Sequence, residues 1–242
     1  MDPDYTDQYE RFELAHWWFV ARRRIIHAAI DRYAGRALAH PRWLDVGCGS
    51  GVLLHSYPAI TDKLGVEMDP GSVARARAKG LDVRQCAGAW DFRDLGSFDL
   101  ITVTDVLEHI EHEPPAIDAV RAVLRDNGIL LITVPALMSL WSSHDVVNRH
   151  FRRYTRSSLV RLFPSKQWKV LKATYFSSLL LTPIWLARKW KNLHGSASPE
   201  GHDFRFGPYD RLLQGIFNLE DPWLRMGNFP LGSSILLVLQ KV

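Results

Sequence analysis

"LDVGCGSG", residues 44–51, begins as an apolar strand and runs into a loop with glycines at 47, 49 and 51. Glycines at a strand end let the chain turn sharply and let backbone atoms approach a ligand without a Cβ in the way. Dinucleotide-binding proteins use the spacing G-x-G-x-x-G and aim a helix N-terminus at pyrophosphate, whereas this loop is G-x-G-x-G and follows Asp45. A carboxylate here favours an ammonium group over a phosphate.

A second acidic residue, Glu67, ends the strand-like run at residues 63–68, about twenty residues beyond the loop. Doubly wound α/β folds place an acidic side chain at this point, where it accepts hydrogen bonds from ribose hydroxyls. The two acids together predict a ribose-bearing cofactor with a cationic, phosphate-free tail.

The surrounding sequence alternates short apolar runs with helical patterns between residues 42 and 134, which is typical of a parallel sheet covered by helices. Asp69 is expected to cap a helix over 70–79, and Thr155 to cap a later one. A further helix is expected over 114–126, ending at Asn127-Gly128. The expected strands are 42–48, 63–68, 81–86, 98–104, 128–134, 168–176 and 233–242.

The chain has 242 residues, of which 47% are hydrophobic, enough for the core of one α/β domain. A net charge of +4 and a pI near 9.1 suit anionic substrates or membrane surfaces but are too weak to indicate nucleic acid. Two cysteines and an acidic N-terminus without a signal-peptide pattern predict a cytoplasmic protein. The apolar run 175–187 contains Pro183 and is shorter than the ~20 residues of a spanning helix, so no transmembrane segment is expected.

Three motifs carry a family resemblance: "LDVGCGSG", "LGVEMDPGSVARARAKG" at 64–80 and "FDLITVTDVLEHI" at 98–110. In this order and at these spacings they closely resemble the class I S-adenosylmethionine-dependent methyltransferases, over about residues 16–174. The resemblance implies an α/β, Rossmann-like sheet of order 3-2-1-4-5-7-6 with the last strand antiparallel. "DVLEHI" is common in the family's small-molecule branch, which includes quinone-biosynthesis enzymes.

The whole chain is expected to form one methyltransferase domain with four parts. These are an N-terminal helical cap at 1–40, a cofactor-binding core at 41–176, a helical insertion or lid at 177–230 and a closing strand at 231–242. The cap, with "HWWFVARRR" at 16–24, is expected to lie on the sheet edge or over a pocket.

The resemblance implies S-adenosylmethionine as cofactor and suggests roles for individual residues. Asp45, Gly47 and Gly49 would line the methionine moiety, Glu67 would bind both ribose hydroxyls, and Met68 would flank the adenine. An acidic residue that the family often has near the adenine amino group is missing, so backbone groups of Ala89 and Trp90 are expected there. The full expected set is Asp45, Gly47, Cys48, Gly49, Glu67, Met68, Ala89, Trp90 and Thr104.

Methyl transfer from a sulfonium is a direct displacement, so the protein mainly aligns the reactants and excludes water. A general base is needed only when the attacking atom arrives protonated. The Asn/Asp-Pro-Pro-Tyr/Phe signature of enzymes that methylate bases or glutamine is absent, which argues against nucleic-acid or peptide amide targets. The expected methyl acceptor is small or amphipathic.

"HDVVNRHFRRYT", residues 144–155, follows the fifth strand and admits several interpretations. A metal site is not expected, because the spacing of His144, Asp145 and His150 matches no standard zinc pattern. Nucleic-acid contact would need a wider basic surface with stacking aromatics. We interpret the segment as binding the methyl acceptor and closing the pocket. The candidate catalytic residues are His109, His144, His150 and Tyr154, and the candidate substrate-binding residues are Trp18, Arg22 and Arg153.

Several alternatives stay open at this point. A binding protein could keep the cofactor site without catalysis, and a nicotinamide-dependent oxidoreductase is a more distant alternative. The apolar segment 178–191 either packs on the domain as a lid or makes peripheral membrane contact. The sequence predicts neither the identity of the methyl acceptor nor the oligomeric state.

Overall fold

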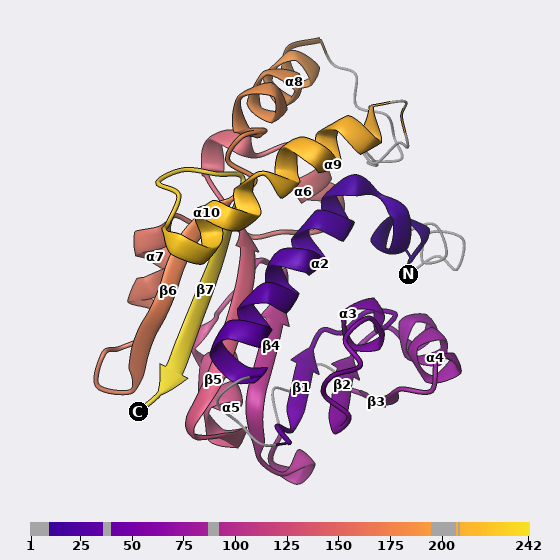
Figure 1. Ribbon diagram of the computed structural model, residues 1–242, viewed down its shortest axis with the longest axis vertical. Coiled ribbons are helices and arrows are strands. Elements are labelled where there is room, and N and C mark those ends of the chain that lie inside the picture. The colour runs from indigo at the N-terminus through magenta and orange to yellow at the C-terminus, as the bar shows by residue number, and fades with distance from the viewer. Residues whose placement is uncertain (1–9, 36–39, 87–91, 195–206, 208) are drawn as a thin grey trace.

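The computed structural model describes residues 10–35, 40–86, 92–194, 207 and 209–242 (Figure 1). Its centre is a seven-stranded sheet of order β3-β2-β1-β4-β5-β7-β6. Strand β7 is antiparallel to both β5 and β6, and the other pairs are parallel. The predicted sheet order and the antiparallel last strand are therefore confirmed. The strands are β1 Trp43–Val46, β2 Lys63–Glu67, β3 Asp82–Gln85, β4 Phe98–Thr104, β5 Leu124–Pro135, β6 Trp168–Phe176 and β7 Ser234–Lys241.

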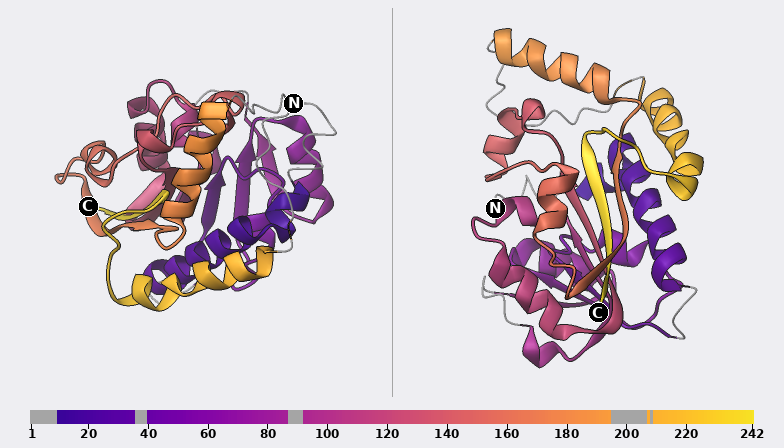
Figure 2. Two further views of the ribbon diagram at one scale, coloured as in Figure 1. Left: turned by 90° about the horizontal axis from the view of Figure 1, so that it is seen from above. Right: turned by 90° about the vertical axis from the view of Figure 1, so that its left-hand side faces the viewer.

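Helices cover both faces of this sheet, as Figure 2 shows. One layer contains α2 and α9, which lie side by side, with Trp17 of α2 edge-on to Phe217 of α9. The opposite layer contains α5 and α7, whose Ile117, Val120 and Leu159 pack on the sheet. The helices are α2 Trp17–Ile30, α3 Val52–His55, α4 Pro70–Ala78, α5 Pro114–Val123, α6 Ser143–Val147, α7 Arg156–Arg161, α8 Leu181–His194, α9 Asp210–Asn218 and α10 Glu220–Met226.

Alternating strand residues feed two separate cores. Leu130 and Ile132 of β5 face the α5 layer, whereas Ile129 and Leu131 face the α2 layer. This alternation follows from the period of two in a strand, and burial on both faces explains why β5 and β7 are nearly continuous apolar runs. No helix within the described ranges is both long and apolar enough to cross a bilayer.

The two predicted helix caps are confirmed, and one helix end is not. The Ser72 N–H donates to Asp69 (2.8 Å) and the Ser158 N–H to Thr155 Oγ1 (3.1 Å). Helix α5 ends at Val123 instead of residue 126, because Leu124 turns into extended backbone and pairs with Phe98. The Asn127-Gly128 pair thus turns the chain within β5, with Asn127 at φ +62°.

The N-terminal segment lies on a sheet face, not at the sheet edge. Ile25, Ile26 and Ile30 of α2 are buried in the same core as Trp43 and Leu131. Residues 10–15 form a separate helical turn before α2. The insertion at 177–230 holds the helices α8, α9 and α10.

Candidate active site at the carboxyl ends of the strands

The glycine loop after β1 needs glycine for steric reasons. Gly47, Gly49 and Gly51 all have positive φ, between 54° and 77°. A Cβ on Gly47 would lie 2.6 Å from Val106 Cγ2, so the loop is packed directly against the segment after β4. The N–H groups of Gly47 and Cys48 donate to Val66 O, which fixes the loop to the end of β2.

Glu67 lies at the end of β2 and faces this loop. Its Oε2 accepts from the Gly49 N–H (2.9 Å), and its Oε1 accepts from the N–H groups of Met68 (2.8 Å) and Asp69 (2.9 Å). The carboxylate is therefore fixed within reach of whatever the loop binds. Met68 is 63% exposed beside it, which suits a side chain that covers a flat ring.

Asp45 lies beneath the loop and is almost fully buried. Thr102 Oγ1 donates to its Oδ1 (2.5 Å) and itself accepts from Trp43 Nε1 (2.8 Å). Burial raises the pKa of Asp45 to about 7, against the hydrogen bond from Thr102. The Cys48 side chain packs over Gly65 in the core, and burial raises the pKa of its thiol, so only its backbone belongs to the loop surface.

Glu13 reaches the loop from the N-terminal cap, and sequence reasoning missed it. Its Oε2 accepts from Ser50 Oγ (3.2 Å), and burial raises its pKa to about 7. The same cap is fixed to α4 by Glu10, which pairs with Lys79 (2.5 Å) and Arg75 (3.4 Å). The acidic N-terminus was visible in the sequence, but no motif linked it to the glycine loop.

Arg22 of α2 is a cation among these carboxyl groups. Its Nη2 pairs with Asp105 Oδ2 (2.8 Å) after β4 and lies 3.4 Å from Thr133 Oγ1 in β5. Its guanidinium also lies over the half-buried Trp18 ring, 5.5 Å from the centroid. Arg22 Nε is buried and has no hydrogen-bond partner among the described residues.

A histidine pair lies on the neighbouring side, after β4 and α6. The His109 and His150 rings meet edge to face with centroids 4.6 Å apart, and the His144 ring lies 6.1 Å from that of His150. Partial desolvation of the ring and the neighbouring His150 lower the pKa of His109 to about 4, although the residue as a whole is exposed. Donor atoms of Glu108, His109 and His150 lie within 4.8 Å of one another, close enough to share a proton or a cation.

Asp145 is the buried anchor of this histidine pair. It is fully buried and accepts from His150 Nδ1 (2.9 Å), Arg153 Nε (2.8 Å) and Arg153 Nη2 (3.1 Å). Although burial opposes ionisation, His150 and Arg153 hold the pKa of Asp145 below its usual range. The Ser142 N–H also donates to Asp145, which closes a capping box at the start of α6.

Two residues expected to meet the methyl acceptor are instead internal braces. Arg153 is 8% exposed, and its guanidinium donates hydrogen bonds to Asp145 and to Ala136 O. Tyr154 is 3% exposed, with its hydroxyl near Leu107 O (3.2 Å) and Glu113 Oε1 (3.0 Å). Neither side chain has its polar group directed at solvent. They hold the loop after β5 against the loop after β4.

Four predicted residues remain. Thr104 ends β4 beside Thr133. His144, on α6, contacts the side-chain amide of Asn148, which follows the helix (3.2 Å). Ala89 and Trp90 lie outside the described residues.

Of the six described non-glycine residues with positive φ, four follow β4, β5 or β6 at this end of the sheet, and His40 and Asn127 lie elsewhere. Asp105, Leu137 and Arg149 all have φ near +60°, which non-glycine residues seldom adopt. All three belong to the segments that follow β4 and β5. Strained residues of this kind cluster at functional sites, which supports placing the site here.

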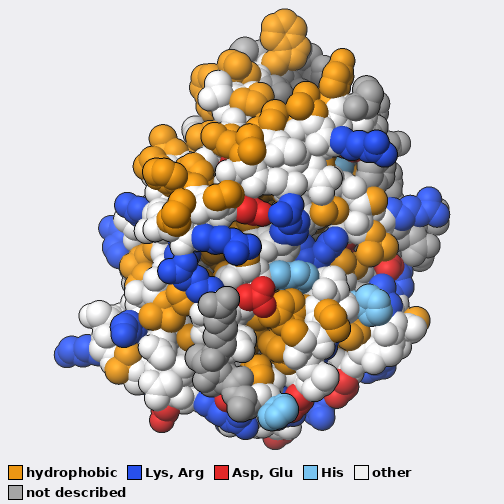
Figure 3. Space-filling model, viewed as in Figure 1, with side chains coloured by type: hydrophobic (Ala, Val, Ile, Leu, Met, Phe, Trp, Pro, Cys, Tyr) orange, Lys and Arg blue, Asp and Glu red, His pale blue; other side chains and the backbone are white. Residues whose placement is uncertain are grey.

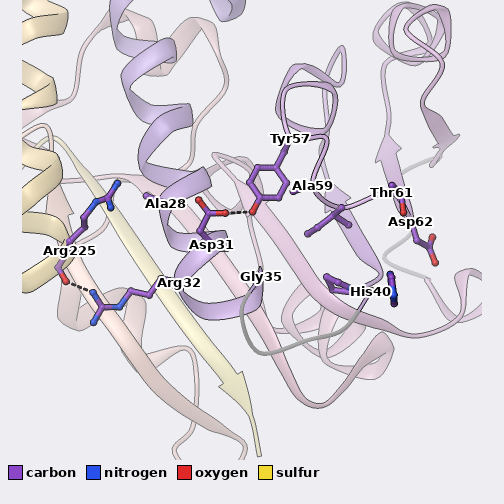
Figure 4. Close-up of a pocket in the computed structure, with 12 residues that line it drawn as sticks. Ala28, Asp31, Arg32, Gly35, His40, Tyr57, Ala59, Thr61, Asp62 and Arg225 are labelled. Atoms are coloured by element: carbon purple, nitrogen blue, oxygen red, sulfur yellow. Dashed lines mark hydrogen bonds between the residues drawn. The ribbon is translucent and has the colours of Figure 1, made fainter.

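A separate hollow of about 770 Å³ lies at the opposite end of the sheet (Figure 4). It is lined by residues that precede β1 and β2, including Pro41 and Ile60, and by Asp31, whose carboxylate accepts from Tyr57. Ligands of open α/β sheets bind beyond the carboxyl ends of the strands, so this hollow is not the expected cofactor site.

Comparison with known proteins identifies the class to which this architecture belongs. A family profile described as "Methyltransferase domain" matches residues 16–173, and the fold is that of Rossmann-like S-adenosylmethionine-dependent methyltransferases. The chain therefore belongs to the methyltransferase domain family. The predicted family, enzyme class and S-adenosylmethionine cofactor are confirmed.

Curated relatives include ubiquinone biosynthesis O-methyltransferases. That of Aromatoleum aromaticum is 28% identical over 171 residues, covering 64% of this chain and 67% of the relative. That of Nitrosococcus oceani is 30% identical over 150 residues, covering 53% and 60%. The chain thus matches two thirds of the length of these relatives or less.

Solved structures share the fold at low identity. A SAM-dependent methyltransferase from Archaeoglobus fulgidus has a TM-score of 0.56 at 15% identity, covering 90% of this chain and 94% of that one. The [4+2]-cyclase SpnF also has a TM-score of 0.56, at 18% identity, covering 93% and 83%. Because this fold also occurs in a cyclase, the reaction has to be argued from the site.

Proposed function

We propose that this protein transfers the methyl group of S-adenosylmethionine to a small or amphipathic acceptor by direct displacement. The observation that carries the proposal is the excess of carboxyl groups around the glycine loop, with Glu13, Asp45 and Glu67 all directed at it or buried beneath it. An ammonium and a sulfonium are both positive, and such a ligand compensates a buried carboxylate such as Asp45 and partly buried ones such as Glu13 and Glu67.

The residues present fit this cofactor in charge as well as position. Glu67 would accept from the ribose hydroxyls, and Met68 would cover the adenine. Glu13 and Asp45 would face the ammonium side, while the unpaired Nε of Arg22 suits the methionine carboxylate. The bound cofactor would supply an electrophilic methyl carbon. The protein would align the reactants, exclude water and accept the proton of the acceptor.

His150 is the proposed proton acceptor, and Asp145 is its positioning residue. An ionised Asp145 can only accept, so its hydrogen bond assigns the proton of His150 to Nδ1 and leaves Nε2 with a free lone pair. As the hydroxyl oxygen of the methyl acceptor bonds to the methyl carbon, the carbon–sulfur bond breaks and the hydroxyl proton passes to the His109–His150 pair. His144 would line the same side, whereas Tyr154 and Arg153 would support it from within.

The methyl acceptor is proposed to be a phenol or a related hydroxyl on an apolar molecule. The printed names of the relatives, ubiquinone biosynthesis O-methyltransferases, support oxygen as the attacking atom. A hydroxyl arrives protonated, which gives the histidine pair a chemical role.

The test combines cofactor binding with turnover. Calorimetry should detect binding of S-adenosylmethionine, and mass spectrometry should detect methylated product from a panel of phenols. Glu67→Ala should weaken cofactor binding by at least about tenfold, since two or more hydrogen bonds are lost. Asp82→Ala, at an exposed carboxylate on β3, is the matched control and should bind normally.

Two results would contradict the proposal. Cofactor binding without methylation of any phenol, catechol or quinol tested would favour the non-catalytic binding protein. Binding of NAD with none of S-adenosylmethionine would favour the oxidoreductase.

A further inference from the structure

The outer side of α8 is apolar although it faces solvent. Pro183, Leu186 and Trp190 of α8 follow one another at intervals of three and four residues, which places them on one stripe, and Leu179 in the turn before the helix extends it. All are exposed, Leu186 to 55% and Trp190 to 67%. The inner side is occupied separately, because Leu180 and Ile184 pack on the core.

A second outer stripe runs along α9 and α10. Leu212, Leu219, Trp223 and Met226 are spaced by seven, four and three residues, and all are more than half exposed. The opposite side already buries Phe217, Leu224 and Glu220. Folding of the described chain therefore accounts for the inner apolar stripe and leaves the outer one without a function. Together the two outer stripes form what we call the insertion surface.

The insertion surface occupies one region of the molecule. In Figure 3, apolar side chains gather at the top and upper left, over the elements that Figure 1 labels α8, α9 and α10. Helix α8 projects beyond the sheet at the end where β1 and β4 finish, which is also the end that holds the glycine loop and the histidine pair (Figures 1 and 2). The inner residues Phe217 and Leu224 face the α2 core instead.

On α8, the charges favour a lipid occupant over a protein occupant. Residues 181–194 include Arg188, Lys189 and Lys191 and no acidic residue. Lys189 Nζ lies 5.8 Å from the Trp185 ring centroid, so an ammonium and an indole are presented together. Tryptophan prefers the headgroup level of a bilayer, and lysine is attracted to anionic headgroups. Apolar, aromatic and purely cationic groups on one short helix match a helix lying in a membrane interface.

We propose that the insertion surface docks this protein on an anionic lipid bilayer, with α8 lying in the headgroup region and without crossing it. The inference deepens the proposed function and rests on it in one respect, because an amphipathic methyl acceptor would partition into that bilayer. Docking then brings the carboxyl end of the sheet to the place where the acceptor is concentrated.

Flotation of the full chain with vesicles tests the proposal. One vesicle type contains phosphatidylcholine alone and the other also contains phosphatidylglycerol. The wild type should float with the anionic vesicles, bind the neutral ones less, and be released by salt, since salt screens the lysines. The double variant Leu186→Ser/Trp190→Ser should lower binding by at least about tenfold, because it withdraws two large apolar contacts. Lys189→Glu should weaken binding to anionic vesicles only.

The matched control is Val170→Ser, which removes an exposed apolar side chain from β6 outside the insertion surface and should float as the wild type does. S-adenosylhomocysteine binding, measured by calorimetry, should be unchanged in every variant and shows that each one is folded. The same measurement separates this inference from the proposed function, which fails when cofactor or turnover is absent whether or not vesicles bind.

Three results would overturn the proposal. The wild type could fail to bind either vesicle, or the double variant could float as well as the wild type. Alternatively, sedimentation could show a dimer that Leu186→Ser/Trp190→Ser converts to a monomer while vesicles are ignored. That last result would assign the surface to a second copy of this chain.

Discussion

The glycine loop and the segment after β5 use their polar residues in opposite ways. Beside the loop, the Glu67 carboxylate is held by backbone N–H groups alone and stays partly exposed at the end of β2. The segment after β5 binds its own groups to one another, as Arg153 does with Asp145 and Tyr154 with Glu113. A dense run of charged and aromatic residues is therefore weak evidence for a binding site, because such residues are equally suited to bracing a loop.

The bracing still serves the chemistry, since it fixes the His150 ring. A fixed loop after β5 holds this ring against His109, and the loop after β4 is tied to the same brace through Leu107 O. One region would thus provide the cofactor contacts, and the other would provide rigid support for one or two working side chains.

The largest expected effect is on the brace. Arg153→Ala leaves a buried Asp145 without its bidentate partner, which typically costs about 3–5 kcal/mol of unfolding free energy. Urea unfolding followed by circular dichroism measures it. Arg156→Ala, at an exposed arginine three residues away, should change stability by less than about 0.5 kcal/mol. Equal stabilities of the two variants would show that the brace is dispensable.

The next effect concerns the working histidines. His150→Gln should lower the methyl-transfer rate by about 10²- to 10³-fold with unchanged cofactor affinity, because general bases contribute on this scale. His112→Gln, at an exposed histidine, is the control and should act as the wild type does. A rate that disappears with EDTA and returns with a divalent cation would instead make the Glu108, His109 and His150 cluster a metal site.

The pH profile examines the same pair from another side. His109 lies against the proposed acceptor His150 and can share the transferred proton only while it is neutral, and its pKa is lowered to about 4. Activity that depends on His109 should therefore be complete at neutral pH and be lost only as pH falls through about 4. An acid limb near 6.5 that His109→Gln leaves unmoved would assign the proton to another group.

How much the sequence predicted differs between the two regions for a physical reason. The glycine spacing, Asp45 and Glu67 are local signals, because a strand end and the loop that follows it are continuous in the chain. Caps such as Asp69 were equally readable, since the donor is three residues away. The sheet order was predicted from the family resemblance. The apolar runs that predicted the strands are explained by burial of the sheet on both faces.

The rest depends on contacts between residues far apart in sequence. Glu13 is hydrogen-bonded to Ser50, and Tyr154 to Glu113, and no spacing pattern in the sequence predicts either pair. The helix predicted to reach residue 126 stopped at Val123 because Leu124 was needed for pairing with Phe98. The sequence also did not predict that Arg153 is buried, because the burial of a side chain depends on the whole fold.

A smaller effect is expected in the glycine loop itself. Gly47→Ala adds a Cβ that would lie 2.6 Å from Val106 and also strains a residue at φ +70°. We expect a cost of about 1–3 kcal/mol and weaker S-adenosylhomocysteine binding by calorimetry. Gly80→Ala is the control for strain alone, because its φ is +78° and nothing lies within 4 Å of the added Cβ. Equal cofactor affinity in the two variants would mean that close packing of the loop on Val106 is unimportant.

The smallest expected effect is a pH dependence that originates at Asp45. Burial raises the pKa of Asp45 to about 7, above its unfolded value, so the folded state binds more protons than the unfolded state over the intervening range. The associated stability is complete below the unfolded pKa and is lost as pH rises through about 7. Thermal melts without cofactor should therefore show a loss of about 1 kcal/mol between pH 6 and pH 8. Asp45→Asn should remove this slope, whereas Asp94→Asn, at an exposed carboxylate, should keep it.

S-adenosylhomocysteine should stabilise the wild type more at pH 8 than at pH 6, because its ammonium group favours the ionised carboxylate. An Asp45→Asn protein that keeps both the slope and this difference would assign them to Glu13, the other loop carboxyl whose pKa is raised to about 7.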